Sequence, residues 1–70
     1  MQITLILLPG AGRTVVNVPE GTTVAQLVAS QGLQNRQIVV EGSTVETRDY
    51  ATTTLQSGWD VAALGNSKGA

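Results

Sequence analysis

The sequence contains neither cysteine nor histidine. Without cysteine no disulfide can form, so stability does not depend on an oxidising compartment. Structural zinc is held mainly by cysteine and histidine, so a zinc site is not expected. Serine and threonine are plentiful, but no histidine is present to activate one as a nucleophile, and Lys68 is the only lysine. We therefore predict a protein that is not an enzyme and that binds no metal and no cofactor.

Charge and long apolar runs are also scarce. The chain has four basic and five acidic residues and a net charge of -1. The basic residues lie far apart, at Arg13, Arg36, Arg48 and Lys68, whereas a nucleic-acid-binding face needs clustered basic residues. The apolar stretch 5–8 is too short to span a bilayer, and no charged segment precedes it as in a signal peptide. We expect no nucleic acid and no membrane as partner, and a cytoplasmic location.

The sequence does have a substantial aliphatic content. Hydrophobic residues make up 41% of its 70 residues, with Trp59 and Tyr50 as the only aromatics. A chain of this length forms one domain at most and buries only ~60% of the surface that its unfolded form exposes. A bound partner or self-association would therefore add useful burial. We expect one domain over 1–64 and a flexible polar tail over 65–70.

The first part of the chain has the pattern of a β-hairpin. Residues 2–8 are β-branched or leucine-rich without a helical period, which predicts a strand. Proline and glycine in 9–12 indicate a turn, and residues 13–18 are predicted to form the second strand. The motif Gly10-Ala11-Gly12 could instead suggest a phosphate loop, but such a loop precedes a helix. A hairpin turn is therefore the better interpretation.

A single helix is predicted over residues 24–31. Thr23 and Gln26 have the spacing of a capping box, and apolar side chains at 24, 27 and 28 form one narrow stripe. Gly32 suits the position that ends a helix. This helix must pack its stripe on one face of a sheet.

The second half of the chain is predicted to add strands. Residues 37–41 and 59–64 have apolar side chains on alternate positions. Residues 44–48 form either a short edge strand or a loop, and residues 49–51 form a tight turn or a short helical turn. The first and last strands are the most apolar, which favours a buried parallel pair at the centre of the sheet. The predicted order is ββαβ(β)β, an α+β fold with a mixed four- to five-stranded sheet.

Several segments resemble the sulfur-carrier branch of the ubiquitin-like β-grasp superfamily. Val-Pro-Glu-Gly-Thr-Thr-Val-Ala-Gln-Leu-Val at 18–28 is similar to the strand-to-helix corner of the thiamine-pathway sulfur carriers and of the small subunit of molybdopterin synthase. Ile-Val-Val-Glu-Gly at 38–42 is similar to the third strand and its turn, and Tyr-Ala at 50–51 falls where the family often has an aromatic. Leu-Gln-Ser-Gly-Trp-Asp-Val at 55–61 resembles the family's Leu-x-x-Gly-Asp-x-Val, with Trp59 at the acidic position and Asp60 following it. The resemblance implies a β-grasp fold.

The C-terminal residues depart from the family pattern. Members of this branch end in Gly-Gly, whose carboxylate is adenylated by a partner enzyme and then becomes a thiocarboxylate. Here Gly69 matches the first glycine and Ala70 replaces the second, which adds a Cβ at the reacting residue. The resemblance thus implies a sulfur-carrier-like protein activated at Ala70 as one hypothesis. With Lys68 as the only acceptor lysine, a carrier fits better than a polymeric tag.

Strand alternation suggests a second hypothesis, based on the sheet face away from the helix. If Ile3, Leu5, Leu7, Val61 and Ala63 face the helix, the opposite face carries Ile6, Leu8, Ala62 and Leu64. An apolar face of this kind indicates binding to another protein or to a second copy. Scattered apolar surface residues that need no explanation are the alternative. Trp59 is either a core residue or a binding anchor. This hypothesis is a non-catalytic, ubiquitin-like binding or assembly module.

Overall fold

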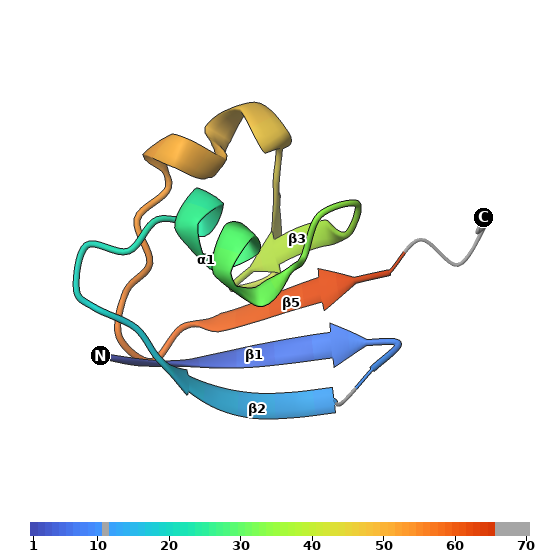
Figure 1. Ribbon diagram of the computed structural model, residues 1–70, viewed down its shortest axis with the longest axis horizontal. Coiled ribbons are helices and arrows are strands. Elements are labelled where there is room, and N and C mark those ends of the chain that lie inside the picture. The colour runs from blue at the N-terminus through green and yellow to red at the C-terminus, as the bar shows by residue number, and fades with distance from the viewer. Residues whose placement is uncertain (11, 66–70) are drawn as a thin grey trace.

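The computed structural model describes residues 1–10 and 12–65, in which seven elements follow one another (Figure 1). The chain forms a small α+β domain with one mixed sheet and one α-helix. Its elements are β1 (Gln2–Leu8), β2 (Gly12–Asn17), α1 (Val24–Gln31), β3 (Gln37–Val40), β4 (Ser43–Val45), the 3₁₀ helix η1 (Thr47–Thr52) and β5 (Asp60–Leu64).

The sheet has five strands in the order β2-β1-β5-β3-β4. β1 pairs with β5 in parallel, and the other neighbouring strands are antiparallel. The predicted central pairing of the first and last strands is therefore confirmed, with Leu5 beside Val61. A parallel pair requires a long crossover between its strands, and here α1, β3, β4 and η1 all lie in that connection.

Helix α1 begins and ends at the predicted residues. The Thr23 hydroxyl accepts a hydrogen bond from the Gln26 backbone N–H at 3.2 Å, and the Thr23 N–H donates to Gln26 Oε1 at 2.9 Å. This is the reciprocal pair of a capping box. At the other end Gly32 has φ 67°, a left-handed conformation that glycine adopts without strain. Leu33 then packs into the core, and its N–H donates to the Val28 carbonyl.

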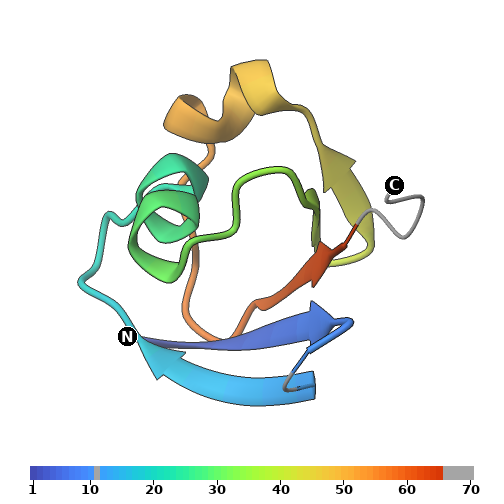
Figure 2. The same ribbon diagram turned by 45° about the vertical axis from the view of Figure 1, so that its right-hand side comes forward.

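One face of the sheet holds the core. Figure 2 shows α1 and η1 on the same side of the strands, with the other side of the sheet uncovered. Successive side chains of a strand point to opposite faces, so β1 and β5 contribute alternate residues to the core. The buried core residues are Ile3, Leu5, Val24, Leu27, Val28, Leu33, Ile38, Val40, Leu55, Val61 and Ala63. Leu7 packs against this cluster as a partly buried side chain.

The segment after β3 contains a shorter edge strand than the one considered over 44–48. Glu41 and Gly42 form a two-residue turn with φ of 50° and 84°, and β4 then ends at Val45. The hydroxyls of Thr52 and Thr53 both donate to the Asp49 carbonyl, which closes η1. β4 gives way to η1 at Glu46, whose carbonyl accepts a hydrogen bond from the Asp49 N–H at 2.8 Å. Of the two alternatives predicted for 49–51, a tight turn or a short helical turn, the helical turn is found, within η1.

The described architecture is compatible with the β-grasp fold that the sequence predicts. β1 has the predicted limits, and the limits of β2, β3 and β5 differ from the predicted ones by at most one residue, which is ordinary variation at element ends. Among the residues that the structure describes, no helix has the length and apolar character needed to cross a membrane.

Candidate functional site

Apolar side chains line up on the sheet face away from α1. Ile6 of β1 lies beside Ala62 of β5, and Ala62 lies beside Val39 of β3. Two residues further along the same two strands, Leu8 lies beside Leu64. Residues at the same level of neighbouring strands share a face, so these five side chains form one group. We call it the open-face patch: Ile6, Leu8, Val39, Ala62 and Leu64.

The open-face patch is partly exposed to solvent. Leu8 is 51% exposed, and the other four side chains are half-buried by their neighbours on the sheet. Val15 of β2 lies on the same face, at the level of Thr4, and is 59% exposed. Leu8 and Val15 are the two exposed large hydrophobic residues of the described chain. The most exposed apolar surface therefore lies on this face and at its β2 border.

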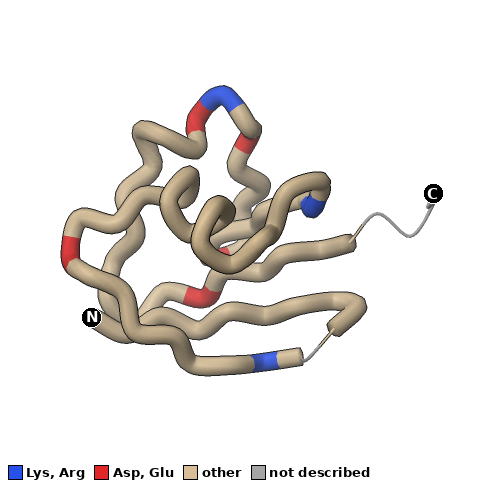
Figure 3. Tube along the Cα trace, viewed as in Figure 1, with Lys and Arg blue, Asp and Glu red and all other residues tan. Residues whose placement is uncertain are grey.

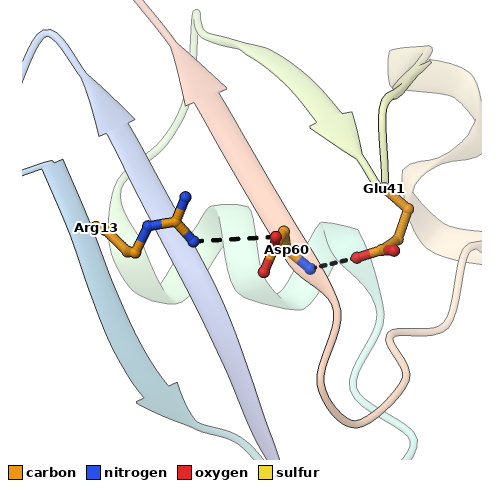
Figure 4. Close-up of polar contacts among 3 residues, drawn as sticks. All are labelled: Arg13, Glu41 and Asp60. Carbon is orange, nitrogen blue, oxygen red and sulfur yellow. Dashed lines mark hydrogen bonds and ion pairs between the residues drawn. The ribbon is translucent and has the colours of Figure 1, made fainter.

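An exposed ion pair crosses the sheet beside the open-face patch. Arg13 projects from β2, and its guanidinium reaches across β1 toward Asp60 of β5 (Figure 4). Arg13 Nη1 lies 4.0 Å from Asp60 Oδ2, with the two side chains 66% and 52% exposed. A long, exposed pair of this kind contributes little to stability. The guanidinium can therefore move away from Asp60 at little energetic cost.

Glu41 adds a second carboxylate at the same border. The Asp60 backbone N–H donates to Glu41 Oε2 at 2.6 Å (Figure 4). The Glu41 N–H in turn donates to the Asp60 carbonyl at 3.0 Å. Glu41 has φ 50° in a turn where glycine, asparagine or aspartate is usual. Asp60 and Glu41 carry two negative charges here against the one positive charge of Arg13. Charged residues are few along the trace (Figure 3), so little offsets this excess and the border is locally acidic.

The opposite end of the patch is fixed by hydrogen bonds to backbone carbonyls. Arg36 Nη1 donates to the carbonyls of Pro9 at 3.2 Å and Ala63 at 3.3 Å, which ties the β1–β2 turn to β5. The Gly65 N–H donates to the Leu8 carbonyl. A Cβ at Gly65 would lie 2.7 Å from Pro9 Cδ, so a larger residue does not fit there without a shift. The strands that carry Leu8 and Leu64 are therefore held firmly at this end.

The structure brings together four of the five partner-binding residues predicted from the sequence. Ile6, Leu8, Ala62 and Leu64 lie side by side in the patch. Trp59 is half-buried and packs against the core, and it is not part of the open-face patch. Gly69 and Ala70, predicted for C-terminal activation, lie outside the described residues.

Sequence reasoning missed other residues of this face, among them Val39, Arg13 and Asp60. Val39 lies between two buried residues, and strand alternation alone would have placed it opposite them. Arg13 and Asp60 are far apart in the sequence, and only the register of three strands brings them together. No local signal predicts that contact.

Neither a protein-family model nor a curated protein matches the chain. The open face is therefore interpreted from its own geometry and chemistry. Its register, exposure and charge define a partly apolar surface with an acidic border.

A second surface feature lies on the helix side of the domain. A cleft of ≈ 540 Å³ is formed by α1 and the loop that precedes it. Its polar side chains are mostly neutral amides and hydroxyls, with Glu20 as the one charged group. Within the described part of the chain, no group of three or more acidic side chains could hold a metal ion. The open face is thus the stronger candidate site.

Proposed function

We propose that this chain is a non-catalytic, ubiquitin-like β-grasp domain that binds another protein through the open-face patch. The observation that carries the proposal is the alignment of Ile6, Ala62 and Val39 across three neighbouring strands on a face that no helix covers. Contiguous apolar side chains left open to solvent are typical of protein-binding surfaces. The helix fills the core without these side chains, so folding alone does not explain their apolar character.

The chemistry of the border indicates what the partner presents. Asp60 and Glu41 leave an acidic excess at this border, and Arg13 is the cation that faces Asp60 there. A partner with apolar side chains and a flanking lysine or arginine would match both parts of this surface. Its cation would bind Asp60 in place of Arg13, whose contact at 4.0 Å is weak.

The patch needs little rearrangement to bind. Its side chains come from β1, β3 and β5, each of which pairs on both sides within the sheet. Strand side chains packed against neighbours lose little conformational freedom on binding, which lowers the entropic cost. We therefore expect the partner to bind a preformed surface.

A matched pair of variants tests the docking surface. Leu8→Asp places a carboxylate in the open-face patch, and Ala29→Asp places the same group at an exposed position on α1. Wild-type and variant chains would be used to capture partners from extracts of the source cells, and a captured protein would then be purified and titrated against each chain. We expect Leu8→Asp to weaken binding at least about tenfold, as loss of an interface anchor does, and Ala29→Asp to leave it unchanged.

Charge complementarity has its own test with the same purified partner. Asp60→Asn keeps the backbone N–H that donates a hydrogen bond to Glu41 Oε2, but it removes the carboxylate that faces Arg13. We expect slower association and a weaker dependence of binding on salt. A partner that binds Leu8→Asp and Asp60→Asn as tightly as wild type would contradict the proposal.

A further inference from the structure

The outer side of β2 is an open sheet edge. β2 pairs with β1 in an unbroken register from Gly12 beside Leu7 to Asn17 beside Gln2. Figures 1 and 2 both show β2 at the border of the sheet, with none of the described elements beyond it. The backbone groups on that side therefore have no strand to pair with in the described chain.

The hydrogen-bond alternation identifies which groups point outward. Met1 and Val18 exchange two backbone bonds, at 2.8 Å and 2.9 Å, and so form a hydrogen-bonded pair in line with the β1–β2 register. Bonded and non-bonded pairs alternate along an antiparallel ladder. The alternation makes Arg13, Val15 and Asn17 the non-bonded residues of β2. Their N–H and C=O groups are directed away from β1.

This edge lacks the features that usually protect an edge strand. Natural edges are blunted by proline, lysine, bulges or short length. β2 has six residues without proline or lysine, its register has no bulge, and its one charged side chain turns across the sheet toward Asp60. The other edge, β4, has three residues and leads directly into η1. Of the two edges of the described sheet, β2 is the long, pairing-competent one.

We propose that β2 pairs antiparallel with β2 of a second copy of this chain. Val15 of one copy faces Val15 of the other, and Arg13 of each faces Asn17 of the other. In this register all three outward residues of each copy lie in hydrogen-bonded pairs. A shift of two residues would leave at least one of them without its counterpart. The arrangement has a twofold axis at Val15, as closed homodimers require.

Three observations favour a second copy over an unrelated strand. The outward residues are spaced symmetrically about Val15, so the edge is complementary to itself. No charge faces a like charge in this register, and the net charge of -1 gives little repulsion between copies. Pairing would also place Val15, the most exposed large hydrophobic residue described, beside the apolar Val15 side chain of the second copy. The contact is small, so we expect a weak dimer that forms at high concentration.

This inference is independent of the open-face docking proposal. It concerns the edge of the sheet, and the twofold axis runs perpendicular to the sheet at Val15. The open-face patches of both copies would remain uncovered on one side of a continuous sheet, so failure of one proposal leaves the other intact.

Backbone amide exchange of the wild-type chain is the first test. Exchange rates would be measured by NMR at low and high protein concentration. Amides of Arg13, Val15 and Asn17 should slow with concentration, about tenfold when nine in ten chains are paired. The amides of Thr14 and Val16, which already bond to β1, should keep their rates. If each of the three outward amides exchanged at the same rate at low and at high concentration, the proposal would be overturned.

Single cysteines test the register in a chain that has none of its own. Facing residues of a hydrogen-bonded pair have Cα atoms about 5.5 Å apart, within the range of a disulfide. Val15→Cys should therefore form a covalent dimer under mild oxidation. Arg13→Cys is the control. Arg13 of one copy faces Asn17 of the other, so the two Arg13 positions are four residues, or about 13 Å, apart along the strands, too far for a disulfide. Equal crosslinking of both variants, or none for Val15→Cys, would overturn the register.

A pair of lysine variants separates the two edges. Val15→Lys would place two like charges opposite each other at the twofold axis. Thr44→Lys adds the same charge to the exposed β4 edge. Sedimentation at high concentration should show that Val15→Lys is monomeric while Thr44→Lys associates as wild type does. Association of Val15→Lys at the wild-type level would contradict pairing through β2.

Discussion

The two faces of the sheet differ in what covers them. On the covered face, Leu5 of β1 is 2% exposed and packs with Val61 under the helix. On the open face, Leu8 of the same strand is 51% exposed. The strand periodicity is the same for both, since alternate residues point to opposite faces. The difference shows that the covered face accounts for folding, while the apolar character of the open face needs another explanation, which we propose is binding.

The largest expected effect compares two leucines of β1. Leu5→Ala should lower the free energy of unfolding by about 2–5 kcal/mol, because it opens a cavity in the core. Leu8→Ala removes the same atoms from an exposed position and should cost less than about 1 kcal/mol. Urea denaturation of both variants at one temperature measures the difference.

A chain of this size has a stability of about 4–10 kcal/mol, so Leu5→Ala should remain measurable at moderate temperature. An unchanged slope against denaturant would show that both variants unfold from the same compact state. Equal losses for the two leucines would mean that the open face contributes to folding as strongly as the core does, and the contrast between the faces would fail.

A smaller effect is expected at the start of the covering helix. Thr23→Ala removes the hydroxyl that accepts the Gln26 N–H at 3.2 Å, and loss of such a cap costs about 1 kcal/mol. Thr23→Ser keeps the hydroxyl and serves as the control. Thermal unfolding should give a lower midpoint for the alanine variant alone. A serine variant as unstable as the alanine variant would instead implicate the lost methyl group.

Local signals predicted α1 well because its limits depend on neighbouring residues. Thr23, Gln26 and Gly32 each act within one turn of the helix, so their spacing in the sequence is sufficient. β4 was not settled by the sequence because it has three residues and depends on pairing with β3. It ends where the chain enters η1, whose first turn is closed by the Asp49 N–H donating to the Glu46 carbonyl.

The candidate site was predicted only in part, because some of its features are local in the sequence and others depend on strand pairing. Alternation placed Ile6 and Leu8 on one face from the sequence alone. Their alignment with Ala62, Leu64 and Val39 depends on strand register, which is set by the packed core and by non-local pairing. The charged border could not be predicted, since it forms only when β2, β5 and the turn after β3 come together.

A still smaller effect on stability is expected for the ion pair on the open face. Arg13→Gln removes the contact to Asp60 at 4.0 Å and should change the free energy of unfolding by less than about 0.5 kcal/mol. Under the docking proposal, the same variant should bind a cation-bearing partner at least as tightly as wild type, because Asp60 no longer has a competing arginine. Titration at low salt measures this. A stability loss comparable to Leu5→Ala would show that the open face is structural.

The smallest expected effect comes from removing residues 66–70. A chain that ends at Gly65 keeps the N–H that donates to Leu8 and the contacts of Arg36 with Pro9 and Ala63. Its free energy of unfolding and its binding through the open face should therefore match wild type. The sulfur-carrier hypothesis predicts the reverse, because it requires Ala70 as the activated terminus.

Intact mass after incubation with ATP and a sulfur-carrier activating enzyme separates the two hypotheses on the same samples. A Gly-Gly-ended carrier is the positive control. A sulfur-for-oxygen or adenylate-sized shift on the full chain, together with loss of function on truncation, would favour activation at Ala70. No shift, together with full binding by the truncated chain and lost binding by Leu8→Asp, would locate the function on the uncovered face of the sheet.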